Sequence, residues 1–220
     1  MLRCEKLVKI YKGKTEVRAI DDISFSINDA EIVGLLGPNG AGKTTTIKSL
    51  CCLINPSSGK IWIDGIDVTK NPYFAYNKIA SVLEGNRNIY WRLTVKENLI
   101  FFAGLMGYSY KYRKDQIDEL INIFKLKEKT NTEARFLSRG MQQKLAIACA
   151  LIKDTEILLL DEPTLGLDVE STHEVQNLLK NEMVNKGRTI LLSSHNMRVI
   201  ENVCERVIVI NKGKIVADES

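Results

Sequence analysis

A glycine-rich segment near residue 40 has the spacing of a phosphate-binding loop. It reads Gly37-Pro38-Asn39-Gly40-Ala41-Gly42-Lys43-Thr44, followed by Thr45. Its glycines let successive backbone N–H groups point into one concavity, and a helix after the loop presents its positive end to phosphate. Lys43 supplies a charge for the β- and γ-phosphates, and the Thr44 hydroxyl can bind Mg²⁺. A glycine turn that only caps a helix would require neither the Lys43 nor the Thr44 side chain. We therefore expect all nine residues, 37–45, to bind a nucleoside triphosphate.

Two adjacent carboxylates follow an apolar run at residues 157–160. The run has the length of a buried strand, so Asp161 and Glu162 are expected at its carboxyl end, where open α/β sheets bind ligands. Asp161 is expected to hold the Mg²⁺ shell, and Glu162 to act as general base on a water that attacks the γ-phosphate. A strand that ends in solvated acids is the alternative, which the phosphate loop makes less favoured.

His195 and Tyr11 are single side chains in positions that suit such a site. His195 follows an apolar run at residues 189–192 and two serines, and its imidazole can bond the γ-phosphate, although a lone histidine is more often structural. Tyr11 precedes the loop and can stack on adenine, and an exposed tyrosine near a turn is an equally good interpretation. Residues 211–214, Asn-Lys-Gly-Lys, lack the aspartate that reads guanine, which disfavours a GTPase.

The elements that must position these residues form a mixed α/β pattern. Alternation at residues 23–27 predicts a half-buried antiparallel strand, and the apolar run 32–36 leads into the phosphate loop, with a helix expected over 44–53. Further strands are expected at 61–65, 157–160, 189–192 and 207–210, with a helix near 175–184. Between about 96 and 152 the pattern is mainly helical. We therefore expect one domain over 1–220, with a catalytic core at about 1–84 and 153–220 and a helical subdomain at about 85–152.

Composition limits the class of protein. The chain has 220 residues, 45% of them hydrophobic and 26% charged, as in a soluble globular domain. A net charge of +4 is too small to indicate a nucleic-acid partner, and the aromatic and basic residues at 108–114 are better interpreted as a solvated loop that enters a helix at Asp115. No apolar run approaches the roughly 20 residues that cross a bilayer, so work at a membrane would need an anchor from a partner. Five cysteines without Cys-x-x-Cys spacing are expected to be reduced core residues.

Taken in order, these motifs resemble the nucleotide-binding domain of ATP-binding cassette (ABC) transporters along essentially the whole chain. The family's Leu-Ser-Gly-Gly-Gln signature corresponds to Leu137-Ser138-Arg139-Gly140-Met141, and residues 163–168 correspond to its D-loop region. The resemblance gives His195 the place of the switch histidine and Tyr11 that of the adenine-stacking aromatic. It implies an α/β fold: a P-loop NTPase core with an antiparallel β-subdomain and a helical insertion.

The resemblance also implies partners. Each ATP would lie between the phosphate loop of one subunit and the signature of another, where Ser138 offers a hydroxyl and Gly140 a close backbone N–H. The second subunit would be another copy of this chain or a related ATPase. ATP hydrolysis with Mg²⁺ would drive a separate transmembrane permease from the cytoplasmic face of the membrane. Two other classes of ATPase are alternatives to a transporter subunit. One is the soluble ABC ATPases that act on nucleic acid or ribosomes, which usually carry two cassettes or a long insertion. The other is ATP-dependent regulators.

Two places depart from the family's pattern. Arg139 and Met141 replace a glycine and a glutamine of the signature, and Arg139 either adds charge near the γ-phosphate or, as we favour, faces solvent. Glu84 stands where the family usually has glutamine, and it is expected among the catalytic and metal-binding residues because either side chain offers an oxygen to Mg²⁺ or its water. Residues 84–94 resemble those of drug and antibiotic exporters, with Tyr90 and Trp91 as contacts to the membrane subunit or as a local hydrophobic cluster.

Overall fold

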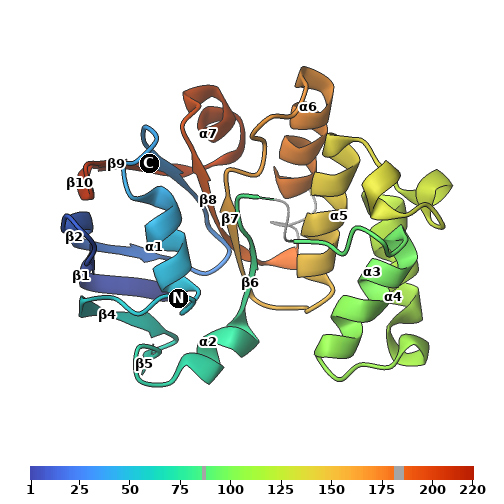
Figure 1. Ribbon diagram of the computed structural model, residues 1–220, viewed down its shortest axis with the longest axis horizontal. Helices are drawn as coiled ribbons and strands as arrows, with labels where there is room; N and C mark the ends of the chain where they lie inside the picture. The colour runs from blue at the N-terminus through green and yellow to red at the C-terminus, as the bar shows by residue number, and fades with distance from the viewer. Residues whose placement is uncertain (86–87, 181–185) are drawn as a thin grey trace.

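Two β-sheets of different construction divide the strands of the protein (Figure 1). The computed structural model describes residues 1–85, 88–180 and 186–220. Within them, one sheet is antiparallel with the order β2-β1-β4-β5, and the other has the order β10-β9-β3-β8-β7-β6. The strands of the second sheet run parallel except for β10, which is antiparallel to β9.

The antiparallel sheet is built mainly from the N-terminal part of the chain. Its strands are β1 (Leu2–Tyr11), β2 (Val17–Ile27), β4 (Ser58–Ile63) and β5 (Ile66–Asp67). The larger sheet contains β3 (Ile32–Leu36), β6 (Ile79–Val82), β7 (Ile157–Asp161), β8 (Thr189–Ser194), β9 (Arg206–Asn211) and β10 (Lys214–Glu219). Every residue of β7 and β8 is buried, as expected for central strands of a parallel sheet that is covered on both faces.

The helices lie on both sides of the larger sheet and gather at one end of the molecule. They are α1 (Lys43–Leu50), α2 (Pro72–Lys78), α3 (Val95–Leu105), α4 (Tyr110–Ile123), α5 (Arg139–Leu151), α6 (Val169–Leu178) and α7 (Met197–Val203), with short 3-10 turns η1 (Lys127–Lys129) and η2 (Ala134–Phe136). In Figure 1, α3, α4 and α5 lie together, away from the antiparallel sheet. Thr94 and Glu97 form a capping box that fixes the start of α3.

Alternation along the central strands produces two hydrophobic cores. On β7, Leu158 and Leu160 pack into a core shared with α3, α4 and α5, whereas Ile157 and Leu159 pack into a core shared with the antiparallel sheet and α1. Side chains of a strand point alternately to its two faces, so one apolar run serves both cores. The larger sheet is therefore the rigid layer that positions whatever lies at the carboxyl ends of its strands.

The strand expected at residues 32–36 is confirmed with the same bounds, and the strands expected at 23–27, 61–65, 157–160, 189–192 and 207–210 are confirmed with shifted ends. The expectation of a solvated loop up to Asp115 is wrong, because α4 already begins at Tyr110, where the Ser109 hydroxyl caps it by accepting from Tyr112 N–H. The helix expected near 175–184 begins earlier, at Val169, and residues 181–185 lie outside the described part of the chain. The division into core and helical subdomain stays a prediction.

The cysteines of the described residues are unpaired, as expected. Burial raises the pKa of the Cys4 and Cys51 thiols to about 12, so both stay protonated at neutral pH. Cys149 is also buried, within the core around α5. These side chains act as small core residues and are poor nucleophiles.

Candidate nucleotide site

The phosphate loop joins β3 directly to α1. Gly42 has φ 109° and precedes the first residue of α1, and a Cβ there would lie 2.4 Å from the Ala19 carbonyl oxygen. A Cβ on Gly37 would lie 2.2 Å from the Ile210 carbonyl oxygen, so neither position accepts another residue without a shift of backbone. The Gly37 N–H donates to the Ser194 carbonyl oxygen at 3.2 Å, which ties the loop to the end of β8. Neighbouring strands therefore hold the loop in shape.

Lys43, the first residue of α1, folds back into this loop. Its Nζ donates to the carbonyl oxygens of Gly37 at 2.7 Å and Pro38 at 3.2 Å, and lies 3.2 Å from Glu162 Oε1. The side chains of Lys43 and Glu162 are each 6% exposed. Their charges attract more strongly there than in water, which offsets part of the cost of burying them. The predicted phosphate-binding lysine thus lies beside the predicted general base.

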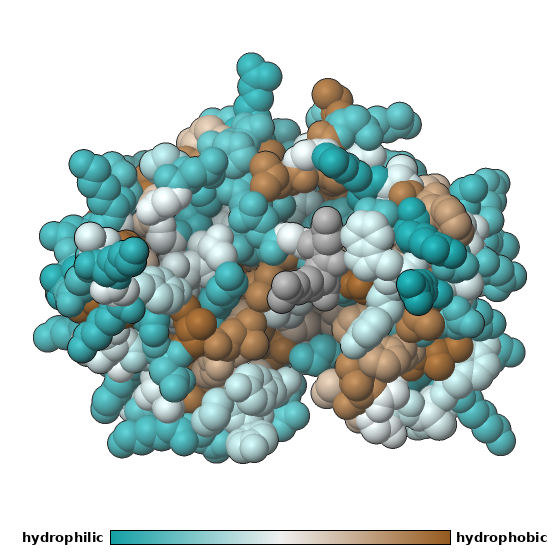
Figure 2. All heavy atoms as spheres, in the orientation of Figure 1, coloured by the Kyte–Doolittle hydropathy of each residue, from teal (hydrophilic) through white to brown (hydrophobic). Residues whose placement is uncertain are grey.

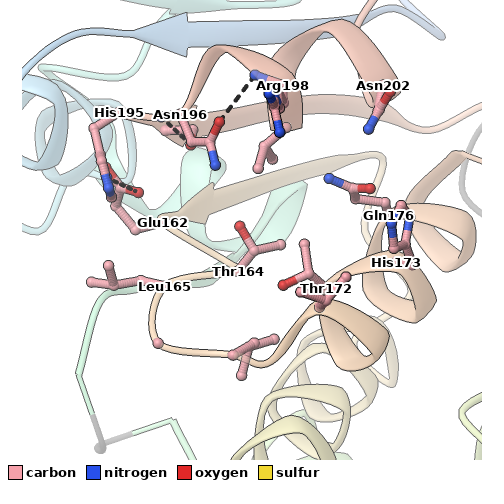
Figure 3. A pocket seen from close by; sticks show the side chains of 15 residues that line it. Glu162, Thr164, Leu165, Thr172, His173, Gln176, His195, Asn196, Arg198 and Asn202 are labelled. Carbon is pink, nitrogen blue, oxygen red and sulfur yellow. Dashed lines mark hydrogen bonds and ion pairs between the residues drawn. The ribbon is translucent and has the colours of Figure 1, made fainter.

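Asp161 and Glu162 meet the end of β8 because β7 and β8 are adjacent and parallel, with Asp161 in register with Ser193. Ser193 Oγ donates to Asp161 Oδ1 at 2.7 Å and accepts from Glu162 N–H at 2.9 Å. His195 Nδ1 lies 3.0 Å from Glu162 Oε2 (Figure 3). These contacts form one chain of polar groups. Our sequence reasoning missed Ser193, whose signal was a hydroxyl near the end of a buried strand.

The two carboxylates keep oxygens that suit a cation. Asp161 is 1% exposed, and its Oδ2 has no hydrogen-bond donor within the described residues. Glu162 Oε1 also lacks a hydrogen bond there, although the Lys43 ammonium lies at ion-pair distance in poorer geometry. Buried carboxylate oxygens are costly without a donor or a metal ion, and Mg²⁺ prefers such ligands. Glu162 has φ 49°, a strained value for a residue other than glycine, which turns the chain sharply after β7.

Glu84 lines a cleft together with the same two carboxylates. This cleft has a volume of about 430 Å³, and its lining includes Glu84, Arg139, Asp161 and Glu162. Arg139 is exposed, as we favoured, but its Nη1 would lie 3.6 Å from a Cβ on Gly166, so the guanidinium also lies against the loop after β7. Glu84 and Arg139, two of the three residues that depart from the family's pattern, therefore line one space.

The remaining predicted residues lie apart from the phosphate loop. Tyr11 ends β1 with its side chain 42% exposed and Lys9 Nζ 5.2 Å from its ring centre. Ser138 caps α5, where its Oγ accepts from Met141 N–H at 3.2 Å. Gly140 packs against α6, since a Cβ there would lie 2.3 Å from the Ser171 hydroxyl oxygen. No hydrogen bond joins these residues to the phosphate loop in the part of the chain that the structure describes.

A glycine loop between a buried strand and a helix, with its lysine beside two carboxylates from the neighbouring strand end, defines a nucleoside triphosphatase of the P-loop class. Residues 20–165 match the family described as ABC transporter. The ABC transporter ATP-binding protein NatA of Bacillus subtilis (strain 168) is 39% identical over 92% of this chain and 82% of its own length. The chain belongs to the ABC transporter family.

Other comparisons agree. The methionine import ATP-binding protein MetN of Carboxydothermus hydrogenoformans is 33% identical over 99% of this chain and 66% of its own length, and the lipopolysaccharide export ATP-binding protein LptB of Haemophilus influenzae is 36% identical over 99% and 89%. The structure of the cassette MJ0796, dimeric and bound to ADP and Pi, aligns with a TM-score of 0.89 at 28% identity, over 100% of this chain and 98% of that one.

These findings confirm the expected fold and make the chain the ATP-binding subunit of an ABC transporter, with ATPase activity. Subunits of this family dimerise and work with membrane permease components. Among the described residues, no helix combines the length and the apolar character that a membrane span requires.

Proposed function

We propose that this chain hydrolyses Mg·ATP at the phosphate loop to power a membrane exporter. The observation that carries the proposal is the chain of contacts from Lys43 through Glu162 to His195, with Ser193 linking Glu162 to Asp161. It unites a phosphate-binding cation, a base and an imidazole at one edge of the sheet. Each group has a role in phosphoryl transfer to water.

The two oxygens of Glu162 have different partners, which suggests how the base works. Oε2 faces His195 Nδ1, which orients the carboxylate, and Oε1 faces Lys43 Nζ. When the triphosphate enters, Lys43 would exchange the Gly37 and Pro38 carbonyls and Glu162 for phosphate oxygens. Oε1 would then be free to accept a proton from the attacking water, while His195 would also reach the γ-phosphate.

Three side chains fit a magnesium ion. Thr44, in the first turn of α1, Asp161, with its buried Oδ2, and Glu84, in the cleft with Asp161, would hold it. Mg²⁺ supplies positive charge that stabilises the phosphates as charge develops on them. The carboxylate of Glu84, in place of the family's glutamine, adds negative charge to this set.

The second half of the ATP site would come from another copy of this chain or a related ATPase. Ser138 and Gly140 begin α5, whose N-terminal N–H groups suit phosphate, and the Ser138 side chain is exposed. The MJ0796 cassette, which is dimeric with ADP and Pi bound, supports the pairing of two subunits. The exposed ring of Tyr11 would stack on the adenine.

The membrane partner would dock at exposed aromatic residues of the segment that precedes α3. Figure 2 shows hydrophobic residues gathered around the hollow between the α2 and α3 sides of this face. Tyr90 and Trp91 are 50% and 40% exposed, and the Tyr90 ring packs on Phe101 with centroids 4.4 Å apart, so the cluster itself holds the contact residues in place. Residues 86 and 87 of the exporter-like segment lie outside the described residues. This docking would place the chain at the cytoplasmic face of the membrane.

Export is supported by the resemblance of residues 84–94 to drug exporters and by the similarity to LptB, and it stays a proposal because MetN is named for import. Transport by the permease co-purified with this chain, reconstituted in vesicles, tests the direction. Accumulation of cargo on the ATP-binding side of the membrane would contradict export.

The ATPase mechanism is tested with Glu162→Gln. This variant should bind Mg·ATP and shift from monomer to dimer in size-exclusion chromatography while turnover falls about 10²- to 10⁴-fold. Glu170→Gln, at an exposed carboxylate of α6, is the matched control. Wild-type turnover in Glu162→Gln would rule out its role as general base, and a monomer with and without ATP would rule out the homodimer.

A further inference from the structure

A cleft of about 520 Å³ lies between α6 and α7, beside the loop of residues 164–167 (Figure 3). Glu162 and His195 form one end of it, and the other end is lined by side chains that have no part in the ATP site proposed above. No residue of the phosphate loop or the signature lines this cleft within the described residues. It is therefore a separate space that shares a wall with the catalytic groups.

The wall formed by α6 carries an amide side chain, Gln176, that has no hydrogen bond to the described residues. Thr172, His173 and Gln176 lie on one face of this helix, as their spacing requires, and all line the cleft. Gln176 is only 6% exposed, and its side-chain amide has no hydrogen bond to any described residue. Figure 3 shows the amide extending from α6 toward α7, so it is available to a ligand.

The opposite wall carries an unpaired cation. Arg198 and Asn202, one turn apart on α7, line the cleft across from Gln176. The Arg198 backbone N–H bonds Asn196 Oδ1 at 3.0 Å, but its guanidinium has no ion pair with a described residue. A guanidinium presents a fork of donors that matches the oxygens of a phosphate or a carboxylate.

We propose that this cleft binds a small oxyanion, a phosphate or carboxylate group, held by Arg198, Gln176 and His173. The charges favour an anion: the titratable and charged residues of the lining are Glu162, His173, His195 and Arg198, and the Glu162 carboxylate already faces Lys43 and His195. A bound oxyanion would accept hydrogen bonds from the side chains of Gln176 and Arg198, which have no partner among the described residues. Because Glu162 and His195 share the cleft, an oxyanion there would also adjust ATP hydrolysis.

The two histidines of the chain make a direct test possible. Both line the cleft, so the ring proton signals in an NMR spectrum of the full chain, assigned with His173→Asn, report on it. Potassium phosphate, titrated at constant pH and ionic strength against potassium chloride, should move the His173 signal to saturation. Arg198→Ala and Gln176→Leu, which keeps the side-chain size, should each weaken apparent affinity about tenfold. Arg3→Ala, which removes an exposed charge from β1, should not.

Phosphate can also bind the phosphate loop, and Lys43→Ala separates the two sites. The His173 response should persist in that variant, whose ATP binding is impaired, so failure of the oxyanion site and failure of the ATP site give different results. Acetate that reproduces the shift would assign carboxylates as ligands as well, and a response to phosphate alone would restrict the site to tetrahedral anions. Three results would overturn the proposal. The His173 signal could shift no more with phosphate than with chloride, or it could shift with the same affinity in Arg198→Ala as in the wild type. It could also lose its response to phosphate in Lys43→Ala.

Discussion

The phosphate-loop end and the signature end of the proposed ATP site are built in different ways. At the first, Lys43 and Glu162 are buried and form an ion pair, and Ser193 links Glu162 to Asp161 across two strands. At the second, Ser138 is exposed, and among the described residues its hydroxyl bonds only the Met141 N–H of α5. The folded chain therefore completes one half of the site by itself, while the other half presents a helix end to a partner.

Lys43→Ala should give the largest change, because it breaks the completed half. Loss of the ammonium removes charge-assisted bonds to phosphate and leaves the Glu162 carboxylate buried without its cation. We expect affinity for Mg·ATP, measured by isothermal calorimetry, to fall about 10²- to 10³-fold. Lys48→Ala, in the last turn of the same helix, should bind like the wild type. Equal affinities for both variants would remove Lys43 from the site.

Ser138→Asp should break the exposed half alone. Aspartate caps a helix as well as serine does, so thermal stability should hold, whereas its charge opposes phosphate from a second subunit. We expect turnover to fall about 10²-fold while the monomer binds ATP with unchanged affinity. Ser138→Ala, which loses the cap, should instead lose about 1 kcal/mol of stability. If Ser138→Asp weakens ATP binding by the isolated monomer, the division between the two halves is wrong.

Ser193→Ala should have a smaller effect, because Ser193 acts through its neighbours. The variant loses the bonds to Asp161 Oδ1 and Glu162 N–H, which hold both carboxylates in position. We expect kcat to fall about tenfold with little change in KM. The control is Ser194→Ala, whose hydroxyl bonds Asn196 N–H and neither carboxylate. Similar kcat values for the two variants would show that Ser193 does not position the two carboxylates for catalysis.

The same contrast explains what the sequence could predict. The phosphate loop and β3, β7 and β8 were predictable because glycine spacing and apolar runs are local signals. Ser193 was not, because its role depends on the register of β7 with β8, two strands far apart in the chain. The start of α4 was misplaced because the cap at Ser109 outweighs a polar, aromatic pattern. The position of Gln176 opposite Arg198 likewise depends on how α6 and α7 pack.

The smallest expected effect concerns Glu84 and Arg139, the two charged residues that depart from the family's pattern. Both line the cleft that contains Asp161 and Glu162, so the added negative charge and the added positive charge share one space. Each is exposed, and solvent screening limits their mutual attraction to well under about 1 kcal/mol. Glu84→Gln and Arg139→Gln should each change the Mg²⁺ concentration for half-maximal ATPase only a few-fold, in opposite directions.

The double variant decides whether the two charges compensate. If they do, Glu84→Gln with Arg139→Gln should return the Mg²⁺ requirement to near the wild-type value, because it removes one charge of each sign from the cleft. Mg²⁺-dependent binding of a non-hydrolysable ATP analogue should follow the same cycle, which separates metal affinity from turnover. The two single variants could instead shift the Mg²⁺ requirement in the same direction, and the double variant could show the sum of both shifts. That result would mean that Arg139 acts on the phosphate bound by the partner subunit and not on Glu84. In that case Arg139 would act only at the signature end, which is exposed in the single chain.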